Sequence, residues 1–500
     1  MSLSASPTSI MELSIADIHE RFARGVLTCT ELTQRLLHRI ECYDQQGPCL
    51  KALLTVHPHA LDTARHKDQA YRSNPTTLGP LHGIPVIVKD NYNTADLPTT
   101  GGSIVLAHTQ PPKDCFVVQR LRQAGAIIFA KANLTELALG GTTVSSFGGQ
   151  TRNPYDTLRT PGGSSGGTAA AIAANFGSVG TGSDTGQSIR SPASATNLVG
   201  LRPTRGLVSR SGILPISSTQ DEAGPITRSV ADAARMLDVM AAYDPDDPIT
   251  AFGRRQKPHS YVDFLDQDGL RGARLGLVTD MLGTEAVHAE VNDVVHHAVQ
   301  LMEHLGATVQ RIAIPHFTAL SADLGLERFE FREAFNRYLA QLGPDAPIKT
   351  LAAFLADGRC HPSTKHRLEQ YTAMVDGTRS AEYAHQWRKR DALRQAVMSV
   401  LANHDLDALL YPHQQRLVAL IGEEQLERNG VLSHGTGFPA LTFPGGFARP
   451  TPSAPLGIPI GMELLGPAWS EPQLIRLAYA FEQAAQLRRP PASTPESDAS

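Results

Sequence analysis

The feature that most constrains this chain of 500 residues is a stretch rich in glycine, serine and threonine, residues 140–192. Such a composition is typical of a flexible linker. However, no polar break separates it from the apolar segment 198–201 and the helical pattern at 229–242 that follow. Glycine clusters inside a packed region mark backbone turns or close approach to a ligand. We therefore expect tight turns within a folded domain.

Two serines lie in turns of this stretch. Ser164 lies in the run GGSSGG, residues 162–167, and Ser188 lies in DTGQSIR, residues 184–190. Glycine-rich turns let successive backbone N–H groups point into one concavity, which stabilises an anion. A hydroxyl beside such a nest can attack a carbonyl while the N–H groups hold the oxyanion. Either loop alone is more often a structural turn, so the prediction depends on both serving one site.

A serine nucleophile needs a base, and none of the nineteen histidines lies in a motif that singles it out. Residues 84–88 form a short apolar run that predicts a buried strand, and Lys89 follows directly. Residues 126–129 predict a second such strand, also followed by a lysine, Lys131. Burial depresses the pKa of a lysine, which makes Lys89 a candidate base. For a lysine considered alone, a solvated strand end is the plainer interpretation.

Other known sequence motifs account for fewer of these features. Residues 162–166 match the GxSxG pattern of α/β hydrolases, which would use a later acid and a histidine such as His434, but the second serine loop would then have no function. P-loop, HExxH and dinucleotide-binding patterns are absent from the sequence. The cysteines are scattered, odd in number and without a CxxC pair, which disfavours a disulfide framework or zinc site: Cys29, Cys42, Cys49, Cys115 and Cys360. We expect no metal and no organic cofactor.

Charge and hydropathy exclude several partners. The formal net charge is -4, and no run of five like charges occurs, so a basic surface for nucleic acid is not expected. No apolar stretch approaches eighteen residues, and the first twenty residues lack a signal-peptide pattern. The sequence predicts a cytoplasmic protein with reduced cysteines, no nucleic-acid partner and no membrane partner.

The rest of the chain follows an α/β pattern. A capping box at Thr28–Glu31 predicts a helix to about residue 43. Residues 317–400 are mainly helical, and their apolar stripe is predicted to face the core: Phe331, Phe335, Tyr338 and Leu342. Short strands are expected at 275–278 and 309–312, flanking a helix, and at 409–410 and 440–443. The Pro/Ser/acid-rich residues 490–500 predict disorder.

Taken in order, these motifs resemble the amidase signature family. The resemblance rests on residues 83–91 (GIPVIVKDN), 131–136 (KANLTE), 152–156 (RNPYD), both serine loops, 200–204 (GLRPT), 224–232 (GPITRSVAD) and 437–442 (GFPALT). The order and spacing cover most of residues 30–485. A match of this extent is highly specific, although each part is weak.

The resemblance implies one α/β domain with the amidase signature fold over residues 1–488. Its central, twisted, mixed and mostly parallel sheet would be covered by helices on both faces. The helical segment 317–400 would form part of the substrate wall, and residues 489–500 would be a disordered tail. A homodimer is expected by analogy only.

The resemblance also implies a Ser–cis-Ser–Lys triad, with Ser188 as nucleophile, Ser164 as the bridging serine and Lys89 as base. The implied oxyanion hole consists of the backbone N–H groups of Thr185, Gly186 and Gln187, with that of Ser188. Supporting roles are implied for Ser165, Asp184 and Arg190, the last two as charges that stabilise the loop. Gln187 stands where many members have glycine, and we predict that the backbone there tolerates the side chain.

The implied activity is hydrolysis of a small-molecule carboxylic amide through an acyl-enzyme, with aryl acylamides and carbamates among the candidate substrates. One alternative is a glutamine-hydrolysing subunit of a tRNA-dependent amidotransferase, which would need partner subunits. Gln187 and the variable segment 317–400 favour a stand-alone enzyme over this alternative. A non-catalytic binding protein on the same scaffold is the third hypothesis, and the intact Lys89, Ser164 and Ser188 argue against it.

Overall fold

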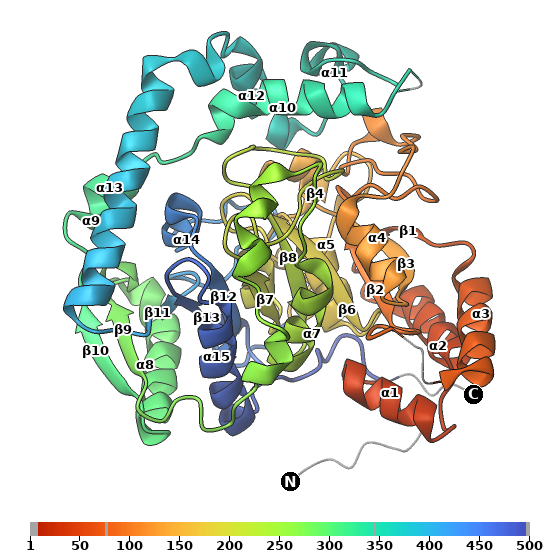
Figure 1. The fold of residues 1–500 in the computed structure, drawn as a ribbon, viewed down its shortest axis with the longest axis horizontal. Helices are drawn as coiled ribbons and strands as arrows, with labels where there is room; N and C mark the ends of the chain where they lie inside the picture. The colour runs from red at the N-terminus through yellow and green to blue at the C-terminus, as the bar shows by residue number, and fades with distance from the viewer. Residues whose placement is uncertain (1–8, 76–78, 345, 497–500) are drawn as a thin grey trace.

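The computed structural model describes residues 9–75, 79–344 and 346–496. Its centre is an 11-stranded sheet in the order β1-β3-β2-β6-β8-β7-β12-β13-β11-β9-β10 (Figure 1). The strands are β1 Leu53–Val56, β2 Pro85–Lys89, β3 Ile127–Ala132, β6 Val179–Asp184, β7 Val199–Arg202, β8 Glu222–Thr227, β9 Arg274–Val278, β10 Thr308–Ile312, β11 Ala408–Pro412, β12 Ala440–Phe447 and β13 Pro459–Leu465. A separate small hairpin pairs β4 Val144–Ser145 with β5 Gly149–Gln150. All of the strands predicted from apolar runs are present.

The sheet is mixed, as predicted, but it is not mostly parallel. Only β3-β2, β2-β6, β11-β9 and β9-β10 are parallel pairs. The middle of the sheet, from β6 to β11, is antiparallel throughout. Parallel neighbours need a long crossover, usually a helix. Here the loops 203–221 and 448–458 connect β7 to β8 and β12 to β13 without a helical crossover, which makes those neighbours antiparallel.

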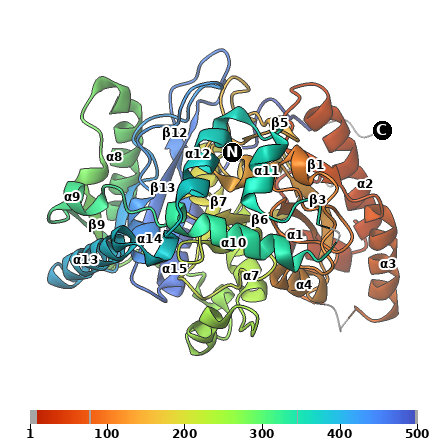
Figure 2. The same cartoon turned by 90° about the horizontal axis from the view of Figure 1, so that it is seen from above.

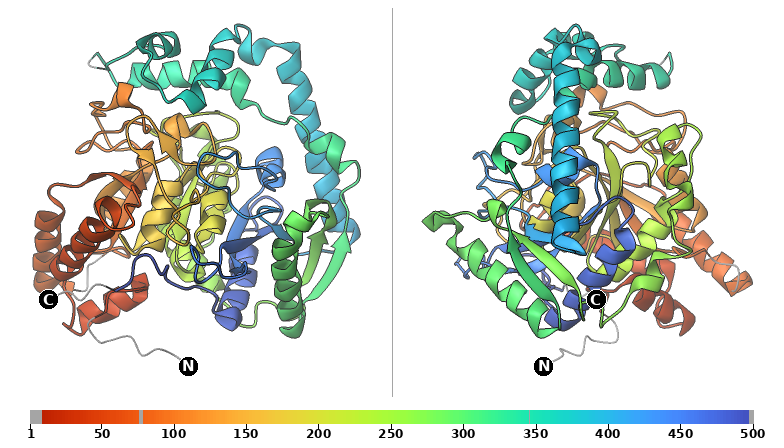
Figure 3. Two further views of the ribbon diagram at one scale, coloured as in Figure 1. Left: turned by 180° about the vertical axis from the view of Figure 1, so that it is seen from behind. Right: turned by 60° about the vertical axis from the view of Figure 1, so that its left-hand side comes forward.

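Helices flank this sheet on both faces (Figure 3). They are α1 Ile15–Ala23, α2 Cys29–Ile40, α3 Ala60–Ser73, α4 Phe116–Gln123, α5 Gly166–Ala173, α6 Arg190–Ala195, α7 Val230–Met240, α8 Ala289–His304, α9 Phe317–Ser321, α10 Glu327–Gln341, α11 Leu351–Asp357, α12 Pro362–Ala373, α13 Ala381–Asn403, α14 Val431–Thr436 and α15 Glu471–Ala485. In the part of the chain that the structure describes, no helix is both long and apolar enough to cross a membrane.

The predicted capping box begins α2. The Thr28 side chain accepts a hydrogen bond from the N–H of Glu31, and the Glu31 carboxylate accepts one from the N–H of Thr28. The α-helix ends at Ile40 and continues as one π-helical turn, Glu41–Gln45. The predicted boundary near residue 43 therefore falls inside that wider turn.

Helices α9 to α13 form an arm that passes over one end of the sheet (Figures 1 and 2). The predicted stripe on α10 is buried, with the rings of Phe331 and Phe335 stacked at 5.3 Å between centroids. These rings share an apolar cluster with Leu137 and Leu214 of the body. The core-facing interpretation of the stripe is confirmed, and the cluster fixes α10 beside the loops that carry the candidate site.

The C-terminal tail differs from the prediction of disorder over its described part. The Arg39 guanidinium donates hydrogen bonds to the carbonyls of Thr494 and Pro495, each at 2.9 Å. Ser493 donates to the carbonyl of Pro154 at 2.6 Å. These bonds attach the tail to the body because the buried arginine needs acceptors, a requirement that composition does not reveal. Residues 497–500 lie outside the described residues.

Candidate active site

Lys89 is the last residue of β2, and its side chain is fully buried. The ammonium nitrogen Nζ lies 2.7 Å from Oγ of Ser164, 2.8 Å from Oγ of Ser183 and 3.2 Å from the Ser183 carbonyl. Among the described residues, no carboxylate lies within 4.0 Å of this nitrogen. Burial lowers the pKa of Lys89 to about 7, although the negative charges of Asp184 and Asp221 oppose the shift. A large share of this lysine is therefore neutral at neutral pH.

Ser164 lies in the turn that precedes α5, and the Gly163–Ser164 peptide bond is cis, as the family resemblance implied. A Cβ at Gly163 would lie within 3.0 Å of the backbone of Gly141 and Thr142, so this position has room only for glycine. Thr143 donates from Oγ1 to the carbonyl of Gly162 at 2.7 Å. The glycine-rich turn is thus packed tightly against residues 141–143, and it holds the Ser164 hydroxyl toward Lys89.

Ser188 lies in the loop between β6 and α6 and is 8% exposed. The N–H of Ser165 donates to the carbonyl of Ser188 at 3.2 Å, and Oγ of Ser165 donates to the carbonyl of Ser183 at 3.3 Å. Ser165 therefore joins the two serine loops. The structure brings Lys89 and Ser164 into direct contact and places Ser188 in the adjoining loop.

Backbone donors remain open in the loop that carries Ser188. Among the described residues, none provides a hydrogen-bond acceptor for the backbone N–H groups of Thr185, Gly186, Gln187 or Ser188. By contrast, the next N–H, that of Ile189, donates to Asp184 at 3.1 Å. Successive free N–H groups beside a hydroxyl form the concavity that an oxyanion requires.

Gln187 fits the loop without backbone strain. Its φ is not positive, so the predicted tolerance for a side chain at this position is confirmed. The Cβ of Gln187 packs against Gly430, and a side chain at position 430 would clash with this Cβ. The side-chain oxygen Oε1 is buried and accepts no hydrogen bond from a described residue.

Two buried ion pairs stabilise the loop that carries Ser188. Asp184 accepts from Nε of Arg190 at 3.1 Å and from Arg202 at 2.8 Å. Burial alone would raise the pKa of Asp184, but the two guanidinium groups hold it well below its usual range. Arg190 also donates to the carbonyl of Gly186 at 2.6 Å. The predicted loop-stabilising contacts of Asp184 and Arg190 are therefore present.

Sequence reasoning missed the second partner of Arg190, which is Glu463 at 2.7 Å. This buried carboxylate also accepts from Tyr411 at 2.8 Å and from Nδ1 of His413 at 2.5 Å. A glutamate within the otherwise apolar run of β13 was the available signal. Its partners come from α6, from β11 and the residue after it, and from Thr442 of β12, which donates at 3.0 Å, so the sheet brings together residues that are distant in sequence.

Comparison with known proteins agrees with this geometry. The Amidase family model matches residues 31–475. The chain belongs to the amidase signature family. A probable amidase of Arabidopsis thaliana is 34% identical over 97% of this chain and 93% of its own length. One subunit of the glutamyl-tRNA(Gln) amidotransferase of Moorella thermoacetica is also 34% identical, over 96% of this chain and 98% of its own length.

Among solved structures, native peptide amidase from Stenotrophomonas maltophilia superposes with a TM-score of 0.87. It is 36% identical and the match covers 97% of this chain and 99% of that chain. This amidase signature protein is therefore a hydrolase that acts on amide C–N bonds.

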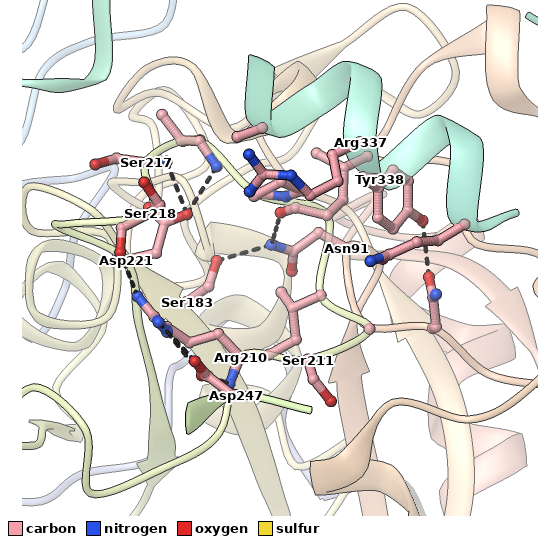
Figure 4. A pocket seen from close by; sticks show the side chains of 18 of the residues that line it. Asn91, Ser183, Arg210, Ser211, Ser217, Ser218, Asp221, Asp247, Arg337 and Tyr338 are labelled. Carbon is pink, nitrogen blue, oxygen red and sulfur yellow. Dashed lines mark hydrogen bonds and ion pairs between the residues drawn. The ribbon is translucent and has the colours of Figure 1, made fainter. Parts of the chain in front are cut away.

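A cavity of about 510 Å³ adjoins the candidate site (Figure 4). Ser183, which contacts Lys89, and Thr185 of the loop that carries Ser188 form part of its wall, whereas Lys89, Ser164 and Ser188 do not. Arg337 and Tyr338 of α10 line the opposite side. The cavity therefore lies next to the candidate site, and Ser183 lies between the cavity and Lys89.

The side chains that could ligate a metal are dispersed. Within residues 9–75, 79–344 and 346–496, no three His, Cys, Asp or Glu side chains form a group suited to a metal ion. The five cysteines are free thiols, three of them buried: Cys29, Cys115 and Cys360.

Proposed function

We propose that this amidase hydrolyses a small-molecule carboxylic amide with Ser188 as nucleophile, Ser164 as proton relay and Lys89 as base. The observation that carries the proposal is the 2.7 Å contact between Nζ of Lys89 and Oγ of Ser164. The lysine is fully buried, and among the described residues no carboxylate contacts it, so its neutral form is available as a base.

The proposed proton path runs from Ser188 through Ser164 to Lys89, and the contact between Lys89 and Ser164 supports its last step. Neutral Lys89 accepts the proton of Ser164, which accepts the proton of Ser188 as Oγ of Ser188 bonds to the amide carbon. The open N–H groups of Thr185, Gly186, Gln187 and Ser188 stabilise the oxyanion, and each such donor contributes about 3–4 kcal/mol in comparable sites.

The proton then returns through Ser164 to the amine nitrogen, and the C–N bond breaks. A water molecule attacks the acyl-enzyme, transfers its proton along the same relay, and releases the carboxylic acid and Ser188. Ser165, Asp184 and Arg190 act as positioning residues, because they fix the two loops through the bonds described above.

The substrate is proposed at the level of a small amide, with aryl acylamides and carbamates included. Similarity to a protein named peptide amidase adds amides of short peptides to the compounds worth testing. Helix α10 supports a role of residues 317–400 as a substrate wall, because Arg337 and Tyr338 line the cavity beside the triad.

A glutamine-hydrolysing amidotransferase subunit is the second candidate, favoured by the 34% identity to the Moorella thermoacetica protein over nearly the full length of both chains. Such a subunit would need partners, whereas the first candidate works alone or as a homodimer. A non-catalytic binding protein would have no use for a buried lysine in contact with Ser164.

One experiment separates these candidates. The purified chain is assayed without partners on primary amides, peptide amides, anilides, esters, carbamates and glutamine, and its oligomeric state is measured by light scattering. We expect hydrolysis of at least one amide class by the wild type and a loss of roughly 10⁴-fold or more in Ser188→Ala. Full activity in Ser188→Ala would exclude the assigned nucleophile. Activity toward glutamine alone, and only with added partner subunits, would favour the amidotransferase.

A further inference from the structure

Backbone carbonyl groups of the loop that carries Ser188 accept hydrogen bonds from buried side chains. Arg202 donates to the carbonyl of Asp184, and Arg190 donates to the carbonyl of Gly186 at 2.6 Å. The peptide bonds of this loop are trans. In a planar trans peptide unit, the carbonyl and the following N–H point in opposite directions. Each arginine therefore turns the N–H that follows its carbonyl to the other side of the loop.

The carbonyl between these two is held by the side chain of Gln220. Its nitrogen Nε2 donates to the carbonyl of Thr185 at 3.4 Å and lies 3.3 Å from Nδ1 of His434. Its oxygen Oε1 accepts from the N–H of Leu326 at 2.5 Å. Because a backbone N–H can only donate, the orientation of the Gln220 amide is fixed, with Nε2 as the donor toward Thr185. This bond turns the next N–H, that of Gly186, away from Gln220.

The three donors lie together on the buried side of the loop. Arg202 donates to the backbone carbonyl of Gln220 at 2.7 Å and to the Asp184 carboxylate at 2.8 Å, and the same carboxylate accepts from Arg190 at 3.1 Å. All four of these residues are buried, whereas residues 185–187 are partly exposed. The N–H groups that point away from the donors therefore face the partly exposed side of the loop.

We propose that Gln220 is a positioning residue of the oxyanion hole, which orients the N–H of Gly186 by holding the carbonyl of Thr185. This role rests on the proposed function, in which the loop holds an oxyanion. Such a donor is effective because it is already directed at the charge that develops in the transition state. The two arginines hold neighbouring peptide units, but both also pair with Asp184, so changing either leaves a buried charge without a partner. Gln220 is neutral, and its bond to the loop can be removed by itself.

The same amide joins the oxyanion loop to the arm of helices α9 to α13. Leu326, whose N–H binds Oε1 of Gln220, directly precedes α10. On the other side lies His434 of α14. Burial, together with the positive charges of three arginines, lowers the pKa of His434 well below its usual value, so its ring is neutral and Nδ1 can accept from Gln220. The direction of Nε2 toward Thr185 therefore depends on the placement of the arm and of α14.

The test is the rate at which an alkyl fluorophosphonate modifies Ser188, followed by mass spectrometry of the whole chain. Oγ of Ser188 bonds to phosphorus, fluoride leaves with the electron pair of the P–F bond, and the serine proton passes to the base. The phosphoryl oxygen gains negative charge in the transition state and needs the same N–H donors as an amide carbonyl. Gln220→Met keeps the length of the side chain and removes the donor. We expect its maximal rate to fall about 10-fold to 100-fold, with the half-maximal concentration changed less than about twofold.

Thr219→Val is the matched control. Thr219 joins the same segment to α10, because its Oγ1 donates to Glu330 at 2.5 Å. Among the described residues, its side chain makes no hydrogen bond to residues 184–188, so this variant should react at nearly the wild-type rate. Thermal unfolding checks that each variant is folded. If Gln220→Met does not fold, Gln220→Glu takes its place, because an ionised glutamate keeps an acceptor for the N–H of Leu326 and lacks the donor.

A Gln220 variant that is modified as fast as the wild type would overturn the proposal, and so would a loss confined to the half-maximal concentration. An equal loss in Thr219→Val would also overturn it, because general support from the arm would then explain both results. These outcomes leave Ser188 in place as the nucleophile. A wild-type protein that is not modified at Ser188 would instead overturn the proposed function, and the role of Gln220 with it.

Discussion

Two lysines lie near the ends of neighbouring strands of the sheet, and both are fully buried, yet their surroundings differ. Lys131 of β3 lies 3.1 Å from the carboxylate of Asp90. It also donates to the carbonyl of Tyr92 and to Oγ1 of Thr99, at 2.9 and 2.8 Å. Within the described part of the chain, Nζ of Lys89 of β2 contacts hydroxyl and carbonyl oxygens and no carboxylate.

The comparison shows that burial alone does not make a lysine a base. Burial lowers the pKa of both side chains, but Asp90 in direct contact opposes that shift at Lys131 and favours its charged form. Lys89 has only the more distant charges of Asp184 and Asp221, and its pKa falls to about 7. We therefore interpret Lys131 as a structural cation that anchors residues 90–99, and Lys89 as the proposed base.

The largest predicted effect is on activity at Lys89. Lys89→Ala removes the proposed base, so kcat/KM should fall by roughly 10⁴-fold to 10⁶-fold, while circular dichroism retains the native spectrum. The measurement is steady-state hydrolysis of the best substrate found in the screen. If Lys89→Ala retained more than a small fraction of the wild-type activity, Lys89 would not be the base. The proposed functional difference between Lys89 and Lys131 would then not hold.

The second predicted effect is on stability at Lys131. Lys131→Met leaves Asp90 buried without its cation, and the free energy of unfolding should fall by about 3–5 kcal/mol in urea denaturation. The matched control is the double variant Lys131→Met with Asp90→Asn, which removes both charges and should recover part of the loss. A Lys131→Met protein as stable as the wild type would contradict the structural role.

The third prediction concerns the pH dependence of the reaction. Only neutral Lys89 can accept a proton, and its pKa is about 7. As pH falls below about 7 the lysine becomes charged, so kcat/KM should fall about tenfold per pH unit on the acidic side. A pH–rate profile from pH 5 to pH 9 measures this limb. The same acidic limb in the residual activity of Lys89→Ala would assign it to another group.

The smallest predicted effect lies at Asp221, whose negative charge raises the pKa of Lys89. Asp221→Asn removes that charge, so the acidic limb should move to lower pH while the rate on the plateau changes little. Asparagine keeps one oxygen to accept from the N–H groups of Ile216 and Ser217. An unchanged or upward shift of the limb would show that Asp221 does not act on Lys89 electrostatically.

Much of the local structure could be predicted from the sequence, because the signals are local. The apolar run before Lys89, the capping box at Thr28 and the stripe on α10 each involve residues within one or two turns or one strand. The same holds for the two glycine-rich serine loops, where each turn needs residues without side chains. Together with the family resemblance, these signals predicted the fold class and the three residues of the proposed triad.

The sequence specifies the candidate reactive groups and the local elements that carry them. Which of the two buried lysines contacts a carboxylate among the described residues depends on long-range packing, because the partners of Lys89 are 75 and 94 residues away in sequence. The same is true of the ion pair between Glu463 and Arg190. The directions of the strands and the path of the C-terminal tail also follow from the tertiary structure, because both depend on long-range pairing and burial. The physical reason is that pKa and hydrogen-bond satisfaction depend on neighbours in space, which no local pattern specifies.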